Sequence, residues 1–206
     1  MSTRVPWRQA YAEVEQPRRL MLACVLGIVL AMLFPTDLQS YRTTPADHGP
    51  VVEGTDHYLR FVNTAAQIAL PLASRDVVGL VQLLYVGLAT TAATHGLKFL
   101  VNSWTIWDVR LGERPSRPGS RYNMPSGHSS MASCAVYYLG RRFGWKHLFY
   151  LVPIMLLTMY ARVELHQHTV SAVIAGMLIG LLMAAIFTGR RRGTTAVPVP
   201  AKDAAA

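Results

Sequence analysis

The stretch Val77–Leu97, VVGLVQLLYVGLATTAATHGL, carries no charged side chain along its whole length. A helix of about 20 apolar residues is long enough to cross a hydrocarbon core of roughly 30 Å. This stretch therefore predicts a membrane-spanning helix. Once one such helix is expected, every other apolar segment of the chain becomes a candidate for a further span.

The composition of the whole chain agrees with a membrane protein. Of its 206 residues, 51% are hydrophobic and only 15% are charged, and the mean hydropathy is +0.25. Soluble domains are about 25% charged. A net charge of +9 would suggest nucleic acid as a partner of a soluble protein, but here the basic residues lie between apolar segments, so no nucleic acid is predicted. Cys24 and Cys134 lie within apolar runs and indicate neither a disulfide framework nor a metal cluster.

The apolar segments number six, and two of them, Val77–Leu97 and Thr169–Gly189, are long enough to span a bilayer alone. The others are shorter and would need tilt or flanking polar residues to complete a span. These shorter segments are Leu20–Phe34, Phe61–Ser74, Ser129–Gly140 and Leu148–Ala161. We predict an all-α polytopic membrane protein with six transmembrane helices, the alternative being a soluble helical bundle. Residues 1–189 would form one domain, and residues 190–206, basic and then Ala- and Pro-rich, a disordered cytoplasmic tail.

The basic residues between these segments predict an orientation. Cytoplasmic loops of membrane proteins carry an excess of Lys and Arg. Arginines precede the first segment, separate alternate pairs of segments and follow the sixth, so an even number of spans places both termini in the cytoplasm. The opposite side then receives residues 36–60, 98–128 and 162–168. The first of these regions is polar and contains Pro50 and Gly54, so we expect it to form an external loop. The last two of these regions are also basic, which an anionic ligand on that side would explain.

Three polar clusters fall on this opposite side. They are Lys98 with the loop DVRLGERPSRPGSRYN at 108–123, the run PSGH at 125–128, and the run ARVELHQH at 161–168. Charged groups near a membrane are costly unless they are paired or hydrated, so several converging cations indicate an anion. Two histidines beside a phosphate would supply a nucleophile and a proton donor, the parts needed for phosphoryl transfer.

The run PSGH stands where the basic loop meets an apolar segment. A helix N-terminus offers unpaired N–H groups and the positive end of a dipole, which suit a phosphate. Gly127 would let the backbone approach that phosphate closely, and His128 would carry a proton beside it. The site contains no carboxylate cluster for a metal, so Lys and Arg would supply the positive charge, and no cofactor or metal is predicted.

These residues resemble the three motifs of the type 2 phosphatidic acid phosphatase (PAP2) superfamily. The matching positions are Lys98, Arg114-Pro115, Pro125-Ser126-Gly127-His128, and Arg162 followed six residues later by His168. The resemblance spans Lys98–Gly176. It implies a PAP2-like bundle of six transmembrane helices and a membrane phosphatase that needs no metal.

The resemblance also implies a role for each motif residue. His168 would be the nucleophile that forms a phosphohistidine. His128 would protonate the leaving oxygen and then help to activate water. The phosphoryl oxygens would be bound by Lys98, Arg114, Arg162, the Ser126 side chain and the Gly127 backbone N–H.

The first motif departs from the family pattern in its spacing. Lys98 and Arg114 are sixteen positions apart, more than is usual, and Thr105 stands where the arginine is expected. Arg117-Pro118 is therefore a second candidate beside Arg114. Arg110 and Arg121 are interpreted as solvated residues or lipid-headgroup contacts.

The third motif lacks the aspartate that the family usually has four residues after the nucleophile. Ala172 stands there and cannot orient an imidazole. The orienting group would then be Glu164 or a backbone carbonyl, unless the protein is a weakened homologue. His166 lies two residues before His168 but lacks the six-residue spacing from Arg162, so we interpret it as a residue of the rim.

Three residues inside the apolar segments are interpreted as packing residues. His95, within Val77–Leu97, is expected to be a packed or hydrogen-bonded histidine. Gly176 and Gly180 lie four residues apart in the sixth segment and indicate close helix packing.

The sequence thus predicts an integral-membrane phosphatase that removes a terminal phosphate from a lipid phosphate or diphosphate. The resemblance suggests undecaprenyl diphosphate, phosphatidylglycerophosphate, phosphatidic acid or lipid A as substrate. The arginine-rich loop favours a headgroup with more than one negative charge, as in a diphosphate or lipid A. One alternative is a lipid phosphotransferase that uses the same intermediate. Another is a degenerate protein that binds anionic lipids without catalysis.

The predicted location is a bacterial inner membrane, which the chain would cross several times. The active site would face the periplasm or the outside, and both termini would lie in the cytoplasm. Its expected partners are the lipid phosphate substrate and the surrounding membrane lipids, and no oligomeric state is predicted.

Overall fold

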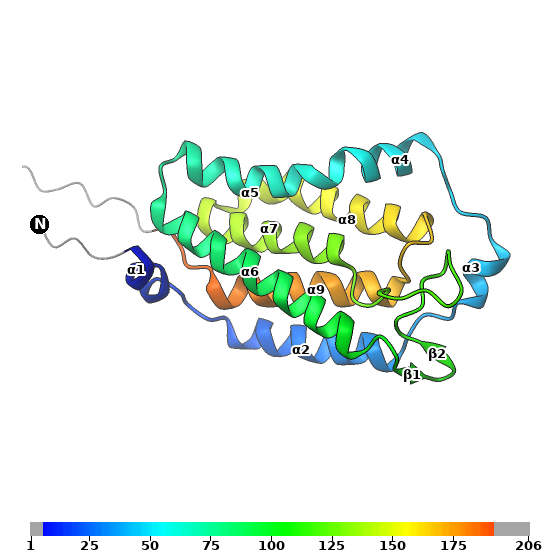
Figure 1. Cartoon of the computed structure of the whole chain (residues 1–206). Helices are drawn as coiled ribbons and strands as arrows, with labels where there is room; N and C mark the ends of the chain where they lie inside the picture. Colours follow the sequence, from blue (N-terminus) through cyan, green and yellow to red (C-terminus); the bar gives the residue numbers. More distant parts are fainter. Residues whose placement is uncertain (1–5, 192–206) are drawn as a thin grey trace, which may run out of the picture.

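The structure is a computed structural model, and it describes residues 6–191. Long helices run side by side along a common axis and make up most of these residues (Figure 1). Each of the six predicted apolar segments lies on one long helix. These are α2 (Arg18–Leu33), α5 (Val62–Ala73), α6 (Val77–Leu100), α7 (Gly127–Phe143), α8 (Leu148–Glu164) and α9 (Val170–Phe187).

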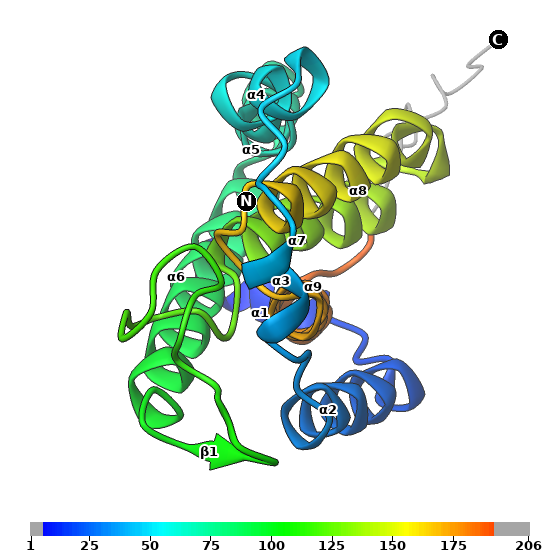
Figure 2. The ribbon, with the colours of Figure 1, turned by 90° about the vertical axis from the view of Figure 1, so that its right-hand side faces the viewer.

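Helix α9 lies at the centre of the bundle. It packs against α7, α2 and α6, and Figure 2 shows it end-on between α2 and α7. The sequence led us to interpret Gly176 and Gly180 as positions of close helix packing. A Cβ atom at Gly176 would collide with the backbone oxygen of Ser126, and one at Gly180 with that of Ser130, so this interpretation is confirmed.

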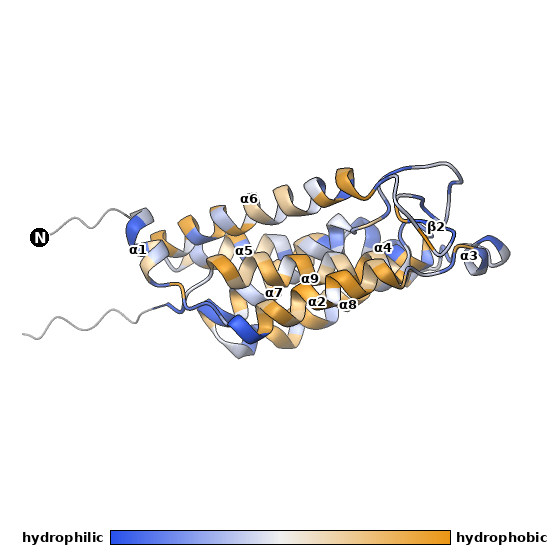
Figure 3. Cartoon of the chain, turned by 90° about the horizontal axis from the view of Figure 1, so that it is seen from below, coloured by the Kyte–Doolittle hydropathy of each residue, from blue (hydrophilic) through white to orange (hydrophobic). Residues whose placement is uncertain are grey.

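The surface along the helices is apolar. Figure 3 shows hydrophobic residues along α2, α8 and α9 and hydrophilic ones toward the ends of the bundle. Large apolar side chains stay exposed there, among them Leu26, Leu30, Leu84, Leu88 and Leu156. Among the described residues, two helices are long and apolar enough to cross a membrane, α6 and α9. They carry the same two segments that the sequence predicted to span alone.

The three regions predicted to share one side do lie together at one end of the bundle, on the right of Figure 1. This end holds α3 (Gln39–Thr43), α4 (Pro50–His57) and the hairpin of β1 (Thr105–Ile106) and β2 (Val109–Arg110). Residues 36–60 were expected to form a loop. They contain two short helices instead, and α4 leads through the 3-10 helix η1 (Leu59–Phe61) directly into α5.

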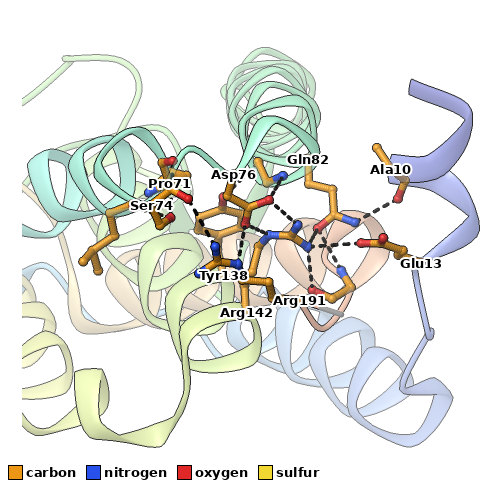
Figure 4. Close-up of polar contacts among 12 residues, drawn as sticks. Ala10, Glu13, Pro71, Ser74, Asp76, Gln82, Tyr138, Arg142 and Arg191 are labelled. Atoms are coloured by element: carbon orange, nitrogen blue, oxygen red, sulfur yellow. Dashed lines mark hydrogen bonds and ion pairs between the residues drawn. The ribbon is translucent and has the colours of Figure 1, made fainter. Parts of the chain in front are cut away.

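A buried cluster of charged and polar groups ties the opposite end together (Figure 4). Arg142 of α7 is 5% exposed, and its Nη2 donates to Asp76 Oδ1 at 2.7 Å while its Nη1 donates to Gln82 Oε1 at 3.0 Å. Gln82 Nε2 in turn donates to the carbonyl oxygen of Ala10 in α1 (Pro6–Ala12) at 2.8 Å. Because a buried charge is costly unless it is paired, this cluster fixes how the ends of α1, α6 and α7 fit together.

The structure also bears on the two cysteines and on the predicted C-terminal tail. Cys24 and Cys134, which lie within apolar runs of the sequence, are both buried, and each is a free thiol in the described part of the chain. The predicted tail at residues 190–206 falls almost wholly outside the described residues, which end at Arg191.

Candidate active site

An inner pocket with a volume of about 280 Å³ opens at the polar end of the bundle. Among the residues that line it are six that the sequence predicted as site residues: Lys98, Arg114, Gly127, His128, Arg162 and His168. His95, interpreted from the sequence as a packed histidine, lines it as well. The structure therefore gathers residues from three separate motifs around one cavity.

Four helix ends converge on this inner pocket. Lys98 lies in the last turn of α6, and Arg162 in the last turn of α8. Helix α7 begins at Gly127 and directs its N-terminus at the pocket, while His168 lies just before Thr169, the N-cap of α9. Cations and a positive helix end thus face the same volume, an arrangement that favours an anion.

Ser126 does not line the inner pocket. Its side chain is fully buried and caps α7, accepting hydrogen bonds from the Ser129 backbone N–H at 3.5 Å and from the Ser129 hydroxyl at 3.1 Å. The sequence predicted this hydroxyl as a phosphate ligand. In the structure this hydroxyl is the N-cap of α7, which needs an acceptor for its first free N–H groups, and its role as a phosphate ligand stays a prediction.

His168 is 2% exposed and its orientation is fixed by the backbone of Asn123. Its Nδ1 lies 2.7 Å from the Asn123 carbonyl oxygen. A carbonyl oxygen only accepts hydrogen bonds, so Nδ1 carries the proton and Nε2 keeps its lone pair. Asn123 is itself held by the Thr169 backbone N–H, which donates to its Oδ1 at 3.1 Å.

This contact identifies the group that takes the place of the missing aspartate. The sequence left two alternatives for this role, Glu164 and a backbone carbonyl, and it is the carbonyl of Asn123 that hydrogen-bonds the ring. Within the described residues the Glu164 side chain forms no hydrogen bond, and its charge lies near the Tyr41 hydroxyl. Ala172 is fully buried in an apolar cluster with Met124 and Ala175.

The charge on His168 is set by its surroundings. Burial lowers the pKa of His168 well below its ordinary value, and the positive charges of Lys98, Arg162 and Arg114 lower it further. The hydrogen bond to Asn123 raises this pKa, but by less. The imidazole is therefore neutral near pH 7, with an available lone pair on Nε2, as a nucleophile requires.

Two arginines of the inner pocket each have a buried N–H group that lacks a hydrogen-bond acceptor in the described residues. The Nε atoms of Arg114 and Arg162 are buried and find no hydrogen-bond acceptor within the described part of the chain. Buried donors of this kind are rare in native proteins, and each one requires an explanation. An oxyanion bound between Lys98, Arg114 and Arg162 would satisfy them.

The structure distinguishes the two candidates for the motif arginine. A second, outer pocket with a volume of about 730 Å³ lies beside the first and is lined by both Arg114 and Arg117. Only Arg114 also lines the inner pocket with His128 and His168. The geometry thus favours Arg114, the residue that we preferred from the sequence.

Two site residues were missed by the sequence analysis, Asp56 of α4 and Arg60 of η1. Asp56 Oδ1 accepts hydrogen bonds from Arg162 Nη1 at 2.6 Å and from Arg60 Nη1 at 3.2 Å. Arg60 Nη1 also lies 3.2 Å from His128 Nε2. Because a guanidinium group only donates, His128 Nε2 accepts this bond and carries no proton in this arrangement.

The carboxyl group of Asp56 is ionised. Burial raises its pKa, but the hydrogen bond and charge of Arg162, together with the charge of Arg60, lower it by more, so the net pKa lies below its ordinary value. The i, i+4 spacing of Asp56 and Arg60 was the available signal, since such pairs are neighbours on a helix. It was missed because the region was interpreted as a loop.

Cations around a neutral, oriented histidine, at the end of an apolar helical bundle, are typical of a membrane protein that binds a phosphorylated ligand. The sequence profile of the PAP2 superfamily matches residues 79–193. The chain belongs to the PAP2 superfamily and is a membrane lipid phosphatase, a phosphoric ester hydrolase.

Individual proteins agree with this assignment. A lipid A 1-phosphatase of Helicobacter pylori is 41% identical over 84% of this chain and 90% of its own length. A lipid A 4'-phosphatase of the same species is 32% identical over 72% of this chain and 76% of its own length. The crystal structure of a PAP2-type phosphatidylglycerolphosphate phosphatase of Bacillus subtilis has the same fold. It gives a TM-score of 0.54 and 24% identity over 82% of this chain and 92% of that protein.

Proposed function

We propose that this phosphatase removes the 1-phosphate of lipid A. The observation that carries the proposal is the 41% identity to a lipid A 1-phosphatase over 84% of the chain, against 32% for a lipid A 4'-phosphatase. Lipid A is one of the four candidate substrates from the sequence, and it fits a pocket rich in arginine. The other candidates, undecaprenyl diphosphate, phosphatidylglycerophosphate and phosphatidic acid, become the comparison substrates of the test.

The first half of the proposed reaction uses both histidines. The Nε2 lone pair of His168 attacks phosphorus, an N–P bond forms, and the P–O bond to the lipid breaks. His128 gives its proton to the departing oxygen. Lys98, Arg114 and Arg162 bind the phosphoryl oxygens as charge shifts toward the transition state, and the Gly127 N–H adds a further donor.

The second half regenerates the enzyme. His128, now neutral, takes a proton from water, which attacks the phosphohistidine and releases inorganic phosphate from His168. Arg60 fits this cycle because it holds His128 Nε2 without a proton before substrate binds. A bound phosphate attracts Arg60 away from His128, and His128 then takes up the proton that the leaving oxygen needs.

The proposed topology places this chemistry at the outer leaflet of a bacterial inner membrane. We infer that all six long helices cross the membrane, with residues 1–189 forming one domain and both termini in the cytoplasm. The basic residues support this orientation. Arg18 begins α2, Arg75 lies between α5 and α6, and Arg141 lies in the last turn of α7. These helix ends lie on the left of Figure 1, away from the inner pocket.

The test of this function is phosphate release by the detergent-purified protein with EDTA present. We expect release from lipid A to exceed release from the other three lipids and to continue in EDTA, because Lys and Arg supply the positive charge. Mass spectrometry of the product would show loss of the 1-phosphate. Release confined to another lipid would overturn the proposed substrate. Transfer of the phosphoryl group to a second lipid, without free phosphate, would instead identify a phosphotransferase.

Asp56 is expected to act as a positioning residue. Asp56→Asn removes the charge that holds Arg162 and Arg60, and a hydrogen bond between charged groups contributes about 1.5–3 kcal/mol. We therefore expect kcat/KM for lipid A to fall roughly tenfold to a hundredfold. Glu53→Gln is the matched control, because Glu53 lies on the same helix and pairs with the exposed His48. Equal losses in the two variants would show that the effect belongs to α4 in general.

A further inference from the structure

The outer pocket is lined by three arginines of one loop, Arg114, Arg117 and Arg121, together with Ser116, Ser120 and Gln167. We propose that it binds a second phosphate group of the same lipid headgroup whose first phosphate is hydrolysed in the inner pocket. This inference rests on the proposed function and extends it to how the enzyme chooses one phosphate over another.

The loop that forms the outer pocket has a defined structure of its own. The Arg114 backbone N–H donates to Ser120 Oγ at 2.9 Å, and the Ser120 backbone N–H donates to the Arg117 carbonyl at 3.1 Å. Gly119 turns the chain with a φ of 71°. The Ser116 N–H donates to the His166 carbonyl at 2.8 Å, which ties the loop to the turn that carries His168.

The positive charge of the outer pocket is not neutralised by neighbouring carboxylates. Within the described residues no ion pair forms with Arg114, Arg117 or Arg121, and the nearby Glu113 pairs with Arg42 at 2.8 Å. Guanidinium groups bind phosphate through parallel N–H donors, and three of them on one concave surface favour a ligand with several negative oxygens.

The two pockets are adjoining parts of one site. Arg114 lines both, and its Nη1 donates at 3.3 Å to Oε1 of Gln167, the residue before His168. The inner pocket, at about 280 Å³, suits a phosphoryl group, whereas the outer one, at about 730 Å³, has room for a sugar with its phosphate. A headgroup that fills both pockets is therefore bound through two of its own anionic groups at once.

This arrangement has a consequence for specificity. The names of the two Helicobacter relatives place phosphates at the 1 and 4' positions of lipid A. If the outer pocket holds one of them, the length of the sugar headgroup fixes which phosphorus reaches His168. The outer pocket would thus bind the 4'-phosphate while the 1-phosphate reacts.

The test compares lipid A that carries both phosphates with lipid A that carries the 1-phosphate alone. Equilibrium binding of each lipid is measured in nanodiscs with His168→Asn, which binds without turnover. Arg121→Ala in this background should reduce the binding preference for the two-phosphate lipid about tenfold, and Arg121→Lys should restore part of it. Arg110→Ala is the charge-matched control, because Arg110 belongs to the same loop region but does not line the outer pocket. It should leave the preference unchanged.

The same preference is then measured in active enzyme as the ratio of kcat/KM for the two lipids. If Arg121→Ala leaves both this ratio and the binding preference at their wild-type values, the proposed second-phosphate subsite is wrong. The proposed function would remain intact. Binding without turnover of either lipid in wild type would overturn the function and still report on the subsite. If Arg121→Ala weakens both lipids equally, and only in nanodiscs that contain phosphatidylglycerol, the pocket binds a neighbouring lipid headgroup and the proposal is wrong.

Discussion

Replacing His168 with asparagine should lower phosphate release from lipid A by roughly 10⁴-fold or more. Burial and the neighbouring cations keep this imidazole neutral. Its Nε2 lone pair is free because the Asn123 carbonyl occupies Nδ1 at 2.7 Å. Asparagine keeps a polar side chain that still reaches toward that carbonyl but has no nucleophilic nitrogen. The loss should therefore fall on kcat, while lipid binding is retained.

His166→Asn is the matched control for this prediction. It makes the same substitution two residues earlier, at a position where the φ of 52° suits asparagine well. The ring of His166 stacks edge-on against Tyr41 with centroids 5.3 Å apart, at the rim of the site. We expect this variant to stay within about threefold of wild type. If His166→Asn is the inactive variant and His168→Asn is not, the assignment of the nucleophile is wrong.

Replacing His128 with alanine should lower release from lipid A by roughly 10²–10⁴-fold, the usual contribution of a general acid. The loss should depend on the leaving group. An aryl phosphate such as p-nitrophenyl phosphate departs as a stable anion and does not need the proton, so formation of the phosphohistidine should survive. Hydrolysis of the phosphohistidine should be lost, because in the proposed mechanism His128 also activates water. Stopped-flow measurements should then show a burst of nitrophenolate stoichiometric with enzyme.

His95→Ala provides the comparison, because it removes another histidine from the lining of the same pocket. This variant should keep the wild-type ratio of activities on lipid A and on the aryl phosphate. Equal losses on both substrates in His128→Ala, with no burst, would mean that His128 has a role other than proton transfer to the leaving oxygen.

The helical fold was largely predictable because hydropathy is a property of short segments. All six apolar segments lie on long helices, and the two that were judged able to span alone are those that meet the length and hydropathy of a span. The error at residues 36–60 came from counting Pro50 and Gly54 as loop residues. Pro50 occupies the first turn of α4, where a proline costs no hydrogen bond.

The inner pocket was predictable where its residues form a local motif. Lys98, Gly127, His128, Arg162 and His168 all line it, because each lies at or beside the end of a helix whose limits the sequence indicates. The spacing of the motif residues along the chain did not indicate which groups from other parts of the chain contact them. The Asn123 carbonyl is a backbone group without a sequence signature, and the inward burial of Ser126 follows from the packing of α7 on α9.

Asp56 and Arg60 belong to this site, yet both precede residue 79, where the match to the superfamily profile begins. The part of the chain that the superfamily profile matches thus leaves out two residues that contact Arg162 and His128. Two PAP2 proteins with the same motif residues can therefore differ in the groups that hydrogen-bond the arginine and the histidine of those motifs. Substrate assignments across the superfamily would gain from comparing the helix before the motifs. The motifs alone identify the reaction, but they do not include the groups that hold the motif residues in place.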